Sequence, residues 1–391
     1  MLFQGTWVGD RTTDLRWEAG RIVDVQDGLQ PSPGEEVVTG GMVTPPLAEP
    51  HVHLDASLLG ARRPNRSGTL REGIANWAEL RRDLTRKDVL ERARETLAMY
   101  RAWGCLRVRT HVDTGCPLAV EALLELRDEV PELQVVAFPQ EGILRHRGAR
   151  AQWEDAVRMG CDAVGAIPHF ERTTEEGWHT LRLAFDLAER LGRSVDLHCD
   201  ETDDPGSRNL EVACAEAIDR AMGQQVVAGH CTALHSYPDP YAAKVIELVA
   251  ESGILVVCNP LDNVVLQGRY DGYPRRRGLT RVDQIWAAGG AVGIGHDSVQ
   301  DPWYPLGTAN LLDAAYMLVH VGHLTGVDEM GRAVRTLWRQ NHRPWGGAPA
   351  LLPGCETPVL WWPVSDEVAL LRERPRPTVW QKGPEPEVEG V

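Results

Sequence analysis

The amino-acid sequence predicts an α/β fold, a (β/α)8 TIM-type barrel with a small β-sandwich domain built from both chain ends. Short apolar runs rich in β-branched residues recur through the middle of the chain, and stretches with helical spacing of apolar residues separate them. From the second run to the eighth, the runs begin 28, 29, 31, 31, 29 and 36 residues apart. Such an interval holds one strand, one crossover helix and two loops. Eight units favour a closed barrel, with an open doubly wound sheet as the alternative.

The predicted barrel strands are short and end in polar residues. They begin near residues 51, 106, 134, 163, 194, 225, 254 and 290. Apolar spacing predicts helices over residues 87–103, 118–129, 175–191, 209–222 and 241–252. The first interval, from residue 51 to residue 106, is too long for one helix and contains a loop at 57–69 before helices begin near Leu70. Barrel enzymes keep lids and specificity elements in such loops after a strand's carboxyl end.

The two chain ends differ from the barrel. Apolar and polar residues alternate there between turn residues, which predicts short strands at 4–8, 21–25, 36–43, 358–362 and 377–381. We therefore expect three parts: one part of a β-sandwich at 1–45, the barrel at 46–345, and the other part of the sandwich with a loose tail at 346–391.

The composition is that of a globular protein and excludes several classes of function. The 391 residues include 41 basic and 56 acidic side chains, a formal charge of −15, and 43% of the residues are hydrophobic. This acidic balance argues against nucleic acid or an anionic membrane as the partner. We identify no signal peptide and no run near the roughly 20 apolar residues that cross a bilayer. The eight cysteines are scattered, so we expect no disulfide framework and a cytoplasmic location.

Two histidines at the end of the first predicted strand are candidate metal ligands. His51 and His53 are two residues apart, so the alternation of a strand places both imidazoles on one face, toward the barrel mouth. Neutral imidazole is the commonest ligand for borderline divalent metals. The pair alone is a weak signal, because two ordinary polar strand residues give the same pattern.

Three later strand ends carry further polar residues. Strand five ends in His198, with Glu201 soon after it, and strand six ends in His230. Strand eight ends in His296 and Asp297, and only one of these neighbours can point inward. A hard carboxylate suits the last metal position, so we predict that Asp297 points inward and His296 outward. A hydrogen-bonded core histidine or an acidic loop edge would explain each residue singly, but their shared place at strand ends favours one site.

Nine stretches carry a resemblance to a known family. The chain resembles the amidohydrolase superfamily and, within it, the bacterial metal-dependent cytosine deaminases. The resemblance covers residues 45 to about 312 and is loose in the two β-rich ends. The matching stretches are PPLAEPHVHLD (45–55), SGTLREGI (67–74), VRTHVD (108–113), VVAFPQEGIL (135–144), GAIPHFE (165–171), HCDETDD (198–204), HCTALHSY (230–237), NPLDNVVLQGRYDGYPRRRGLTRV (259–282) and GHDSVQDPWYPLGTANLL (295–312).

The resemblance implies one divalent metal ion per subunit, zinc or iron. Its implied ligands are His51, His53, His198 and Asp297. Members of the superfamily with two metal ions need a bridging, carboxylated lysine, and none of the predicted strand ends offers one. Four protein ligands leave a position for water, whose pKa the metal would lower toward neutrality.

The resemblance also implies roles for the residues around the metal. Glu201 would move a proton from the water to a ring nitrogen of the substrate, and Asp297 would help to pass a proton to the departing ammonia. His230 would orient the nucleophile and stabilise the developing charge. Gln140 has an amide that donates and accepts at once, so it matches the carbonyl and N–H edge of a pyrimidine.

One position departs from the family pattern and bears on specificity. Where the family carries two consecutive aspartates after strand eight, this chain has Asp297 followed by Ser298. Serine is smaller and uncharged, so we expect a less polar wall beside the ring and acceptance of 5-methylcytosine as well as cytosine. Phe138 and Trp303 are candidate apolar walls for a flat ring, and ordinary core aromatics are the alternative interpretation.

Two other functions remain as alternatives. One is deamination of another heterocycle, such as isoguanine, creatinine or a triazine. The other is a catalytically inactive, metal-binding scaffold, although Glu201 and Asp297 are both present. For partners we expect a small nucleobase substrate, no nucleic acid, no membrane, and assembly into a homo-oligomer.

Overall fold

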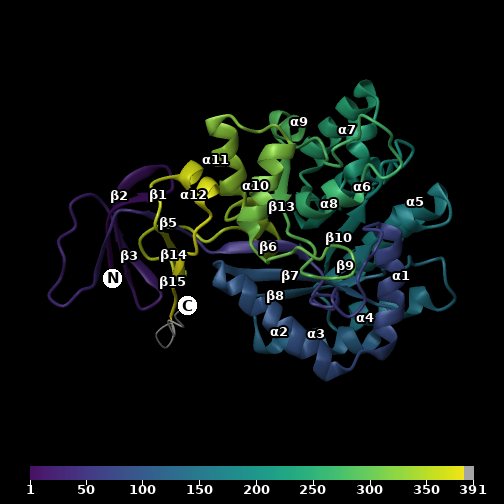
Figure 1. The fold of residues 1–391 in the computed structure, drawn as a ribbon, viewed down its shortest axis with the longest axis horizontal. Coiled ribbons are helices and arrows are strands. Elements are labelled where there is room, and N and C mark those ends of the chain that lie inside the picture. The colour runs from purple at the N-terminus through teal and green to yellow at the C-terminus, as the bar shows by residue number, and fades with distance from the viewer. Residues whose placement is uncertain (383–391) are drawn as a thin grey trace.

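Eight parallel strands form the barrel in this computed structural model, which describes residues 1–382 (Figure 1). Each strand pairs with the next along the chain, so the sheet runs in sequence order from β6 to β13. The expected strand–helix periodicity is confirmed. The strands are β6 (Leu47–Val52), β7 (Cys105–Asp113), β8 (Leu133–Phe138), β9 (Ala163–Ala166), β10 (Ser194–Cys199), β11 (Val226–His230), β12 (Leu255–Cys258) and β13 (Ala291–Ile294).

Helices cover the outside of the barrel. The five predicted helices all form, and three helices begin at a threonine whose side chain accepts a hydrogen bond from the first turn: Thr69, Thr85 and Thr173. The helices are α1 (Leu70–Leu80), α2 (Arg86–Ala102), α3 (Pro117–Glu129), α4 (Ala149–Met159), α5 (Thr174–Leu191), α6 (Asn209–Asp219), α7 (Asp239–Ser252), α8 (Pro260–Leu266), α9 (Val282–Ala287), α10 (Leu311–Val321), α11 (Val327–Thr336) and α12 (Glu367–Glu373).

The barrel closes where its first and last strands meet. Val52 and Asp297 form an isolated parallel bridge, and the Asp297 N–H donates to the His51 carbonyl oxygen at 2.9 Å. The fully buried side chain of Asn341 joins the two strands at a second point. Its Oδ1 accepts from the Ile294 N–H at 2.9 Å, and its Nδ2 lies 2.8 Å from the carbonyl oxygens of both Ala48 and Ile294. Closure therefore depends on these few contacts.

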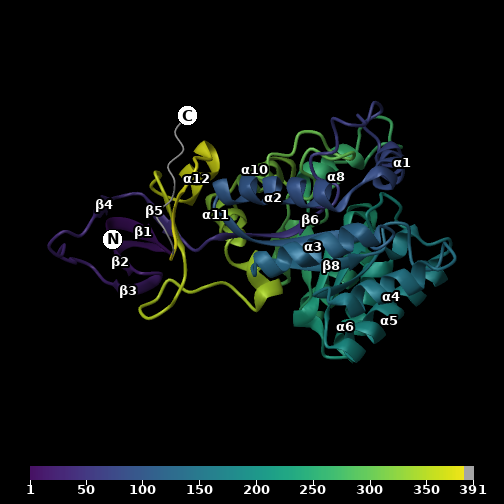
Figure 2. The same cartoon turned by 90° about the horizontal axis from the view of Figure 1, so that it is seen from below.

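The two chain ends meet in a β domain at one end of the molecule (Figures 1 and 2). Seven strands form one mixed sheet in the order β15-β14-β5-β1-β2-β3, with β4 beside β1. Backbone hydrogen bonds from Ile22 to Cys355 and from Thr357 to Gly20 join the β3 edge to the segment that leads into β14, so the sheet curls around its own apolar cluster. The strands are β1 (Leu2–Val8), β2 (Arg11–Glu18), β3 (Arg21–Val25), β4 (Val37–Thr39), β5 (Met42–Thr44), β14 (Val359–Trp362) and β15 (Thr378–Trp380).

Three further expectations concern the cysteines, membrane-spanning helices and the C-terminal tail. All eight cysteines are free, as their scattered spacing predicts. In the part of the chain that the structure describes, no helix combines the length and the apolar character needed to cross a bilayer. The expected loose tail falls almost wholly on residues 383–391, which lie outside the described residues.

Replacing Asn341 with alanine tests the closure of the barrel. The change leaves three buried backbone groups without partners, and each costs about 1–3 kcal/mol, so the free energy of unfolding is expected to fall by about 3 kcal/mol or more. Urea denaturation followed by circular dichroism measures the effect. The control is Gln26→Ala, which removes an exposed amide of the β domain. Equal midpoints for the two variants would contradict the role of Asn341.

Candidate active site

Four histidines and one aspartate from four strand ends converge at the carboxyl-terminal mouth of the barrel. The Nε2 atoms of His53 and His198 lie 3.1 Å apart, although the residues come from β6 and β10. Asp297 Oδ1, which follows β13, lies 3.5 Å from His53 Nε2 and 3.7 Å from His51 Nε2. His230, at the end of β11, places its Nδ1 3.8 Å from Asp297 Oδ2. The structure thus brings together the residues that the sequence singled out.

The chemistry of this cluster fits a divalent metal ion. One nitrogen each of His51, His198 and His230 lie within 4.8 Å of one another, and so do ligand atoms of His51, His53 and Asp297. Both ring nitrogens of His51 and the Nδ1 of His198 are buried without a hydrogen-bond partner, which is costly unless something else binds them. Burial lowers the pKa of His51 and His198 well below the usual value and that of His53 to about 3. Neutral imidazole is the form that binds metals.

A deeper set of donors is less suited to a metal. His111 and Asp196 also lie within reach of His51, but they already pair with each other, His111 Nε2 to Asp196 Oδ1 at 3.0 Å. The other carboxylate oxygen of Asp196, Oδ2, accepts a hydrogen bond from Arg109 Nη1 at 2.8 Å. Because both oxygens are engaged, this buried Arg109–Asp196–His111 network supports the floor of the site, and the ring of His111 lies 4.1 Å from that of His51, centroid to centroid.

The backbone turns sharply at two of these strand ends. His230 and Asp297 have positive φ values of 66° and 68°, a left-handed conformation that is uncommon for residues other than glycine and often marks a functional site. The neighbouring His296 faces away from the cavity, as strand alternation predicts, and its Nε2 accepts a hydrogen bond from the Thr308 N–H at 3.2 Å. Local backbone geometry therefore aims Asp297 into the mouth.

Glu201 and His230 lie next to each other beside the cluster. The distance from His230 Nδ1 to Glu201 Oε1 is 3.8 Å. Burial raises the pKa of Glu201 to about 8, so this carboxyl group can hold a proton near neutral pH, and a bound cation would lower its pKa again. The amide Nδ2 of Asn263, on α8, donates to His230 Nδ1 at 3.0 Å, and the Nδ2 of Asn259 lies 3.3 Å from it. Sequence reasoning missed both asparagines.

These residues line a small cavity. Its lining comprises His53, Leu70, Gln140, His198, Glu201, His230, Asp262, Leu266, Asp297, Ser298 and Trp303. Leu70, Glu201 and Leu266 also border a wider vestibule that opens to solvent. The predicted Gln140, Ser298 and Trp303 are therefore all in place at the cavity.

Two neighbours of the cavity differ from the sequence-based expectation. Phe138, expected as a wall for the substrate, stacks on the His198 ring with centroids 3.9 Å apart and planes 17° apart, so it supports this imidazole from behind. Asp262, which we did not predict, accepts a hydrogen bond from Ser298 Oγ to its Oδ2 at 2.5 Å. Its place just after β12, beside the mouth, was the only signal available in the sequence.

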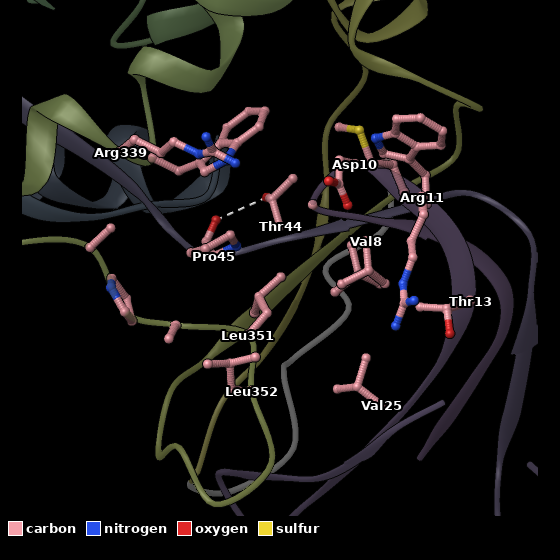
Figure 3. Close-up of a pocket in the computed structure, with 18 of the residues that line it drawn as sticks. Val8, Asp10, Arg11, Thr13, Val25, Thr44, Pro45, Arg339, Leu351 and Leu352 are labelled. Carbon is pink, nitrogen blue, oxygen red and sulfur yellow. Dashed lines mark hydrogen bonds between the residues drawn. The ribbon is translucent and has the colours of Figure 1, made fainter. Parts of the chain in front are cut away.

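A second cavity lies between the β domain and the barrel (Figure 3). Its lining includes Val8, Arg11, Pro45, Arg339 and Leu351. Pro45 leads into β6, so this cavity lies at the amino-terminal side of the barrel strands, opposite the strand ends that carry the histidines. It contains none of the predicted site residues.

The fold and the cluster define a class, a (β/α)8 hydrolase whose site suits a metal ion held by histidines and a carboxylate. Residues 80–337 match the Amidohydrolase family, and the chain belongs to that family. This family match, together with the 37% identical structure of a 5-methylcytosine deaminase, confirms the expected hydrolytic enzyme, a deaminase of the cytosine deaminase-like type.

The similar proteins include deaminases and an amidohydrolase. A solved structure of 5-methylcytosine deaminase from Klebsiella pneumoniae, liganded with 5-fluorocytosine, is 37% identical, with a TM-score of 0.93 over 100% of this chain and 99% of that chain. A pterin deaminase from Rhizobium rhizogenes is 30% identical over 312 residues, 76% of this chain and 69% of the relative. An N-isopropylammelide isopropyl amidohydrolase from Pseudomonas sp. strain ADP is 25% identical over 324 residues, 78% of this chain and 75% of the relative.

Metal content of variants tests the donor set. After reconstitution with zinc, His198→Ala is expected to lose most of its bound metal, because the cluster loses a donor that no neighbour replaces. His111→Ala is expected to keep it, since His111 pairs with Asp196, and the exposed His320→Ala is the control. Metal is measured by inductively coupled plasma mass spectrometry. Loss of metal from His111→Ala with retention by His198→Ala would place the ion at the deeper set.

Proposed function

We propose that the protein removes the exocyclic amine of a free cytosine-type base by hydrolysis, with 5-methylcytosine preferred and cytosine also accepted. The observation that carries this proposal is a small cavity that brings proton-transfer groups and amide recognition to one place. The similarity to a 5-methylcytosine deaminase over the whole chain supports the same choice.

His51, His53, His198 and Asp297 are the residues that would hold the metal ion, which we propose to be a single zinc or iron ion. When bound, such an ion supplies Lewis acidity and makes water a better nucleophile near neutral pH. The three lysines of the chain, Lys87, Lys244 and Lys382, lie outside the cluster, on the outer helices and near the C-terminus. None of them can provide a bridge between two ions.

Glu201 is the proposed proton carrier. The reaction adds water to the ring carbon that bears the amine and then breaks the carbon–nitrogen bond, so a proton must reach first the adjacent ring nitrogen and then the departing ammonia. Glu201 lines the cavity, and burial raises its pKa to about 8, so it can both take up and release a proton at neutral pH. Asp297 faces the same space and would take up the remaining proton of the water.

The other side chains orient the reactants. His230 lies between Glu201 and Asp297, and Asn263 fixes its ring through Nδ1, so it would hold the nucleophile in line with the ring carbon. Gln140, with a side chain only 8% exposed, would bind the carbonyl and N–H edge of the base through its amide. Trp303 also lines the cavity and would supply an apolar surface for the ring.

Ser298 supports the preference for a methylated ring. Its hydroxyl group donates to Asp262, so the hydroxyl is engaged and the small side chain leaves room for a substituent. Filling an apolar gap with one methyl group is worth about 1–3 kcal/mol, or about 10–200-fold in discrimination.

A larger heterocycle is the second candidate. The wider vestibule shares Glu201 with the inner cavity, and a pterin deaminase is among the relatives. Ammonia release from isoguanine, creatinine, a triazine and a pterin, measured beside the cytosines, separates the candidates. One of these four substrates would have to exceed both cytosines in kcat/KM to replace the first proposal.

Replacing Glu201 with glutamine tests the proton carrier. The amide keeps the shape of the side chain but cannot shuttle a proton, so kcat for 5-methylcytosine is expected to fall by about 10²–10⁴-fold, with metal content unchanged. Ammonia release and metal analysis are measured on the same preparation. Glu176→Gln, at the start of α5, is the control on the outside of the barrel. Wild-type turnover by Glu201→Gln would remove the assignment.

A comparison of two substrates tests the specificity. Steady-state ammonia release is expected to give a kcat/KM for 5-methylcytosine about 10-fold or more above that for cytosine, since the methyl group fills space beside Ser298. If the methylated base reacted a hundredfold less efficiently than cytosine, the preference would be wrong while the deaminase assignment would stand.

A further inference from the structure

Asp262 is a buried carboxyl group at the wall of the active-site cavity, on α8. Its side chain is only 1% exposed, and it belongs to the lining of the cavity. One oxygen, Oδ2, accepts the hydroxyl of Ser298 at 2.5 Å. The other, Oδ1, is buried and has no hydrogen-bond partner. None of the mechanistic steps above uses this residue.

The unpartnered oxygen needs a hydrogen-bond donor. A buried acceptor without one costs about 1–3 kcal/mol, and more when it is charged. Within residues 1–382, no arginine or lysine forms an ion pair with Asp262, and no arginine or lysine lines the inner cavity. Because no group of the described residues donates to Oδ1, a molecule bound in the cavity that Asp262 lines can supply the donor.

The surroundings of Asp262 indicate which part of the base would face it. The carboxyl groups of Glu201 and Asp297 belong to the lining of the same cavity as Asp262. Both groups act at the amine-bearing carbon in the proposed reaction. In 5-methylcytosine the amine and the methyl group are attached to neighbouring ring carbons. A wall that joins a carboxyl group to a small serine therefore matches that edge, with the amine N–H beside Asp262 and the methyl group beside Ser298.

We propose that Asp262 is a specificity-determining residue that accepts a hydrogen bond from the substrate's exocyclic amine through Oδ1, while Oδ2 turns the Ser298 hydroxyl away from the ring. This inference rests on the proposed function and narrows its substrate class to bases with an N–H-bearing amine next to an apolar substituent. The product carries a carbonyl oxygen where the amine was, which offers Asp262 no proton. Asp262 therefore favours the substrate over the product.

Asparagine at position 262 is expected to reverse the preference for the substrate over the product. Asp262→Asn keeps an oxygen for Ser298 and presents an NH₂ group to the ligand, so substrate binding weakens and product binding strengthens. For 5-methylcytosine, KM is expected to rise about 10-fold or more, with a smaller change in kcat, while the dissociation constant of thymine falls several-fold. Both are measured on the metal-loaded enzyme, by ammonia release and by isothermal titration calorimetry. A merely structural role would weaken both ligands together.

Three further variants keep the test decisive. Asp283→Asn, on the exposed surface of α9, is the matched control and is expected to leave both constants unchanged. Asp262→Ala removes both hydrogen bonds and is expected to raise KM without tightening thymine, which serves if the asparagine variant fails to fold. Ser298→Ala is expected to keep the preference for 5-methylcytosine within a few-fold, because the hydroxyl already points toward Asp262.

The outcomes separate this inference from the proposed function. An active wild-type enzyme whose Asp262→Asn variant keeps its KM and its thymine affinity within twofold overturns the role of Asp262 alone. A metal-loaded wild-type enzyme that releases no ammonia from either cytosine overturns the proposed function, and this inference falls with it.

Discussion

Closure of the barrel between β6 and β13 is the constraint on which the site depends. Two of the candidate ligands, His51 and His53, lie at the end of the first barrel strand, β6, while Asp297 follows the last barrel strand, β13. The buried carboxylate of Glu49 joins the two chain segments, because its Oε1 accepts from the His51 N–H at 2.9 Å and its Oε2 from the His296 N–H at 3.0 Å. Without these contacts between β6 and β13, candidate ligands that are far apart in the sequence would not lie close enough to bind one cation.

Without a bound cation, the side chains at the mouth favour their uncharged forms. Burial lowers the pKa of the histidines there and raises that of Glu201. Arginine does enter the barrel, but Arg109 is already paired with Asp196 beneath the cluster. A divalent ion would compensate the carboxylates and bind the unpartnered imidazole nitrogens at once. The need to bind a cation also explains why the mouth contains histidines and carboxyl groups, and not side chains that hydrogen-bond fully to one another.

The sequence predicted what depends on local periodicity and failed where packing decides. Strand spacing was sufficient to place the eight barrel strands. Side-chain alternation showed that only one of His296 and Asp297 could point inward, and the preference of a metal site for a carboxylate selected Asp297. Asn263 and Asp262 were missed because their functions arise only when α8 packs over the mouth and brings them to His230 and Ser298. Phe138 was placed in the right region, yet periodicity cannot tell whether an aromatic ring faces a substrate or supports an imidazole. The β domain was expected from alternation, but the curl of its sheet depends on contacts between strands that are distant in the sequence.

Specificity in this fold is then a property of pairs of residues rather than of one motif. Ser298 taken alone already makes this part of the wall smaller and less polar than an aspartate would, but an unpaired hydroxyl group would still be a polar group beside the substrate. The hydrogen bond to Asp262 changes this, because it engages the hydroxyl and places a carboxyl group at the neighbouring point of the wall. The two residues come from different strand–helix units, so a change on α8 can alter what the residue after β13 presents to the ring. We therefore propose that substrate preference depends on how these two segments pack together, and not on the residue after β13 alone.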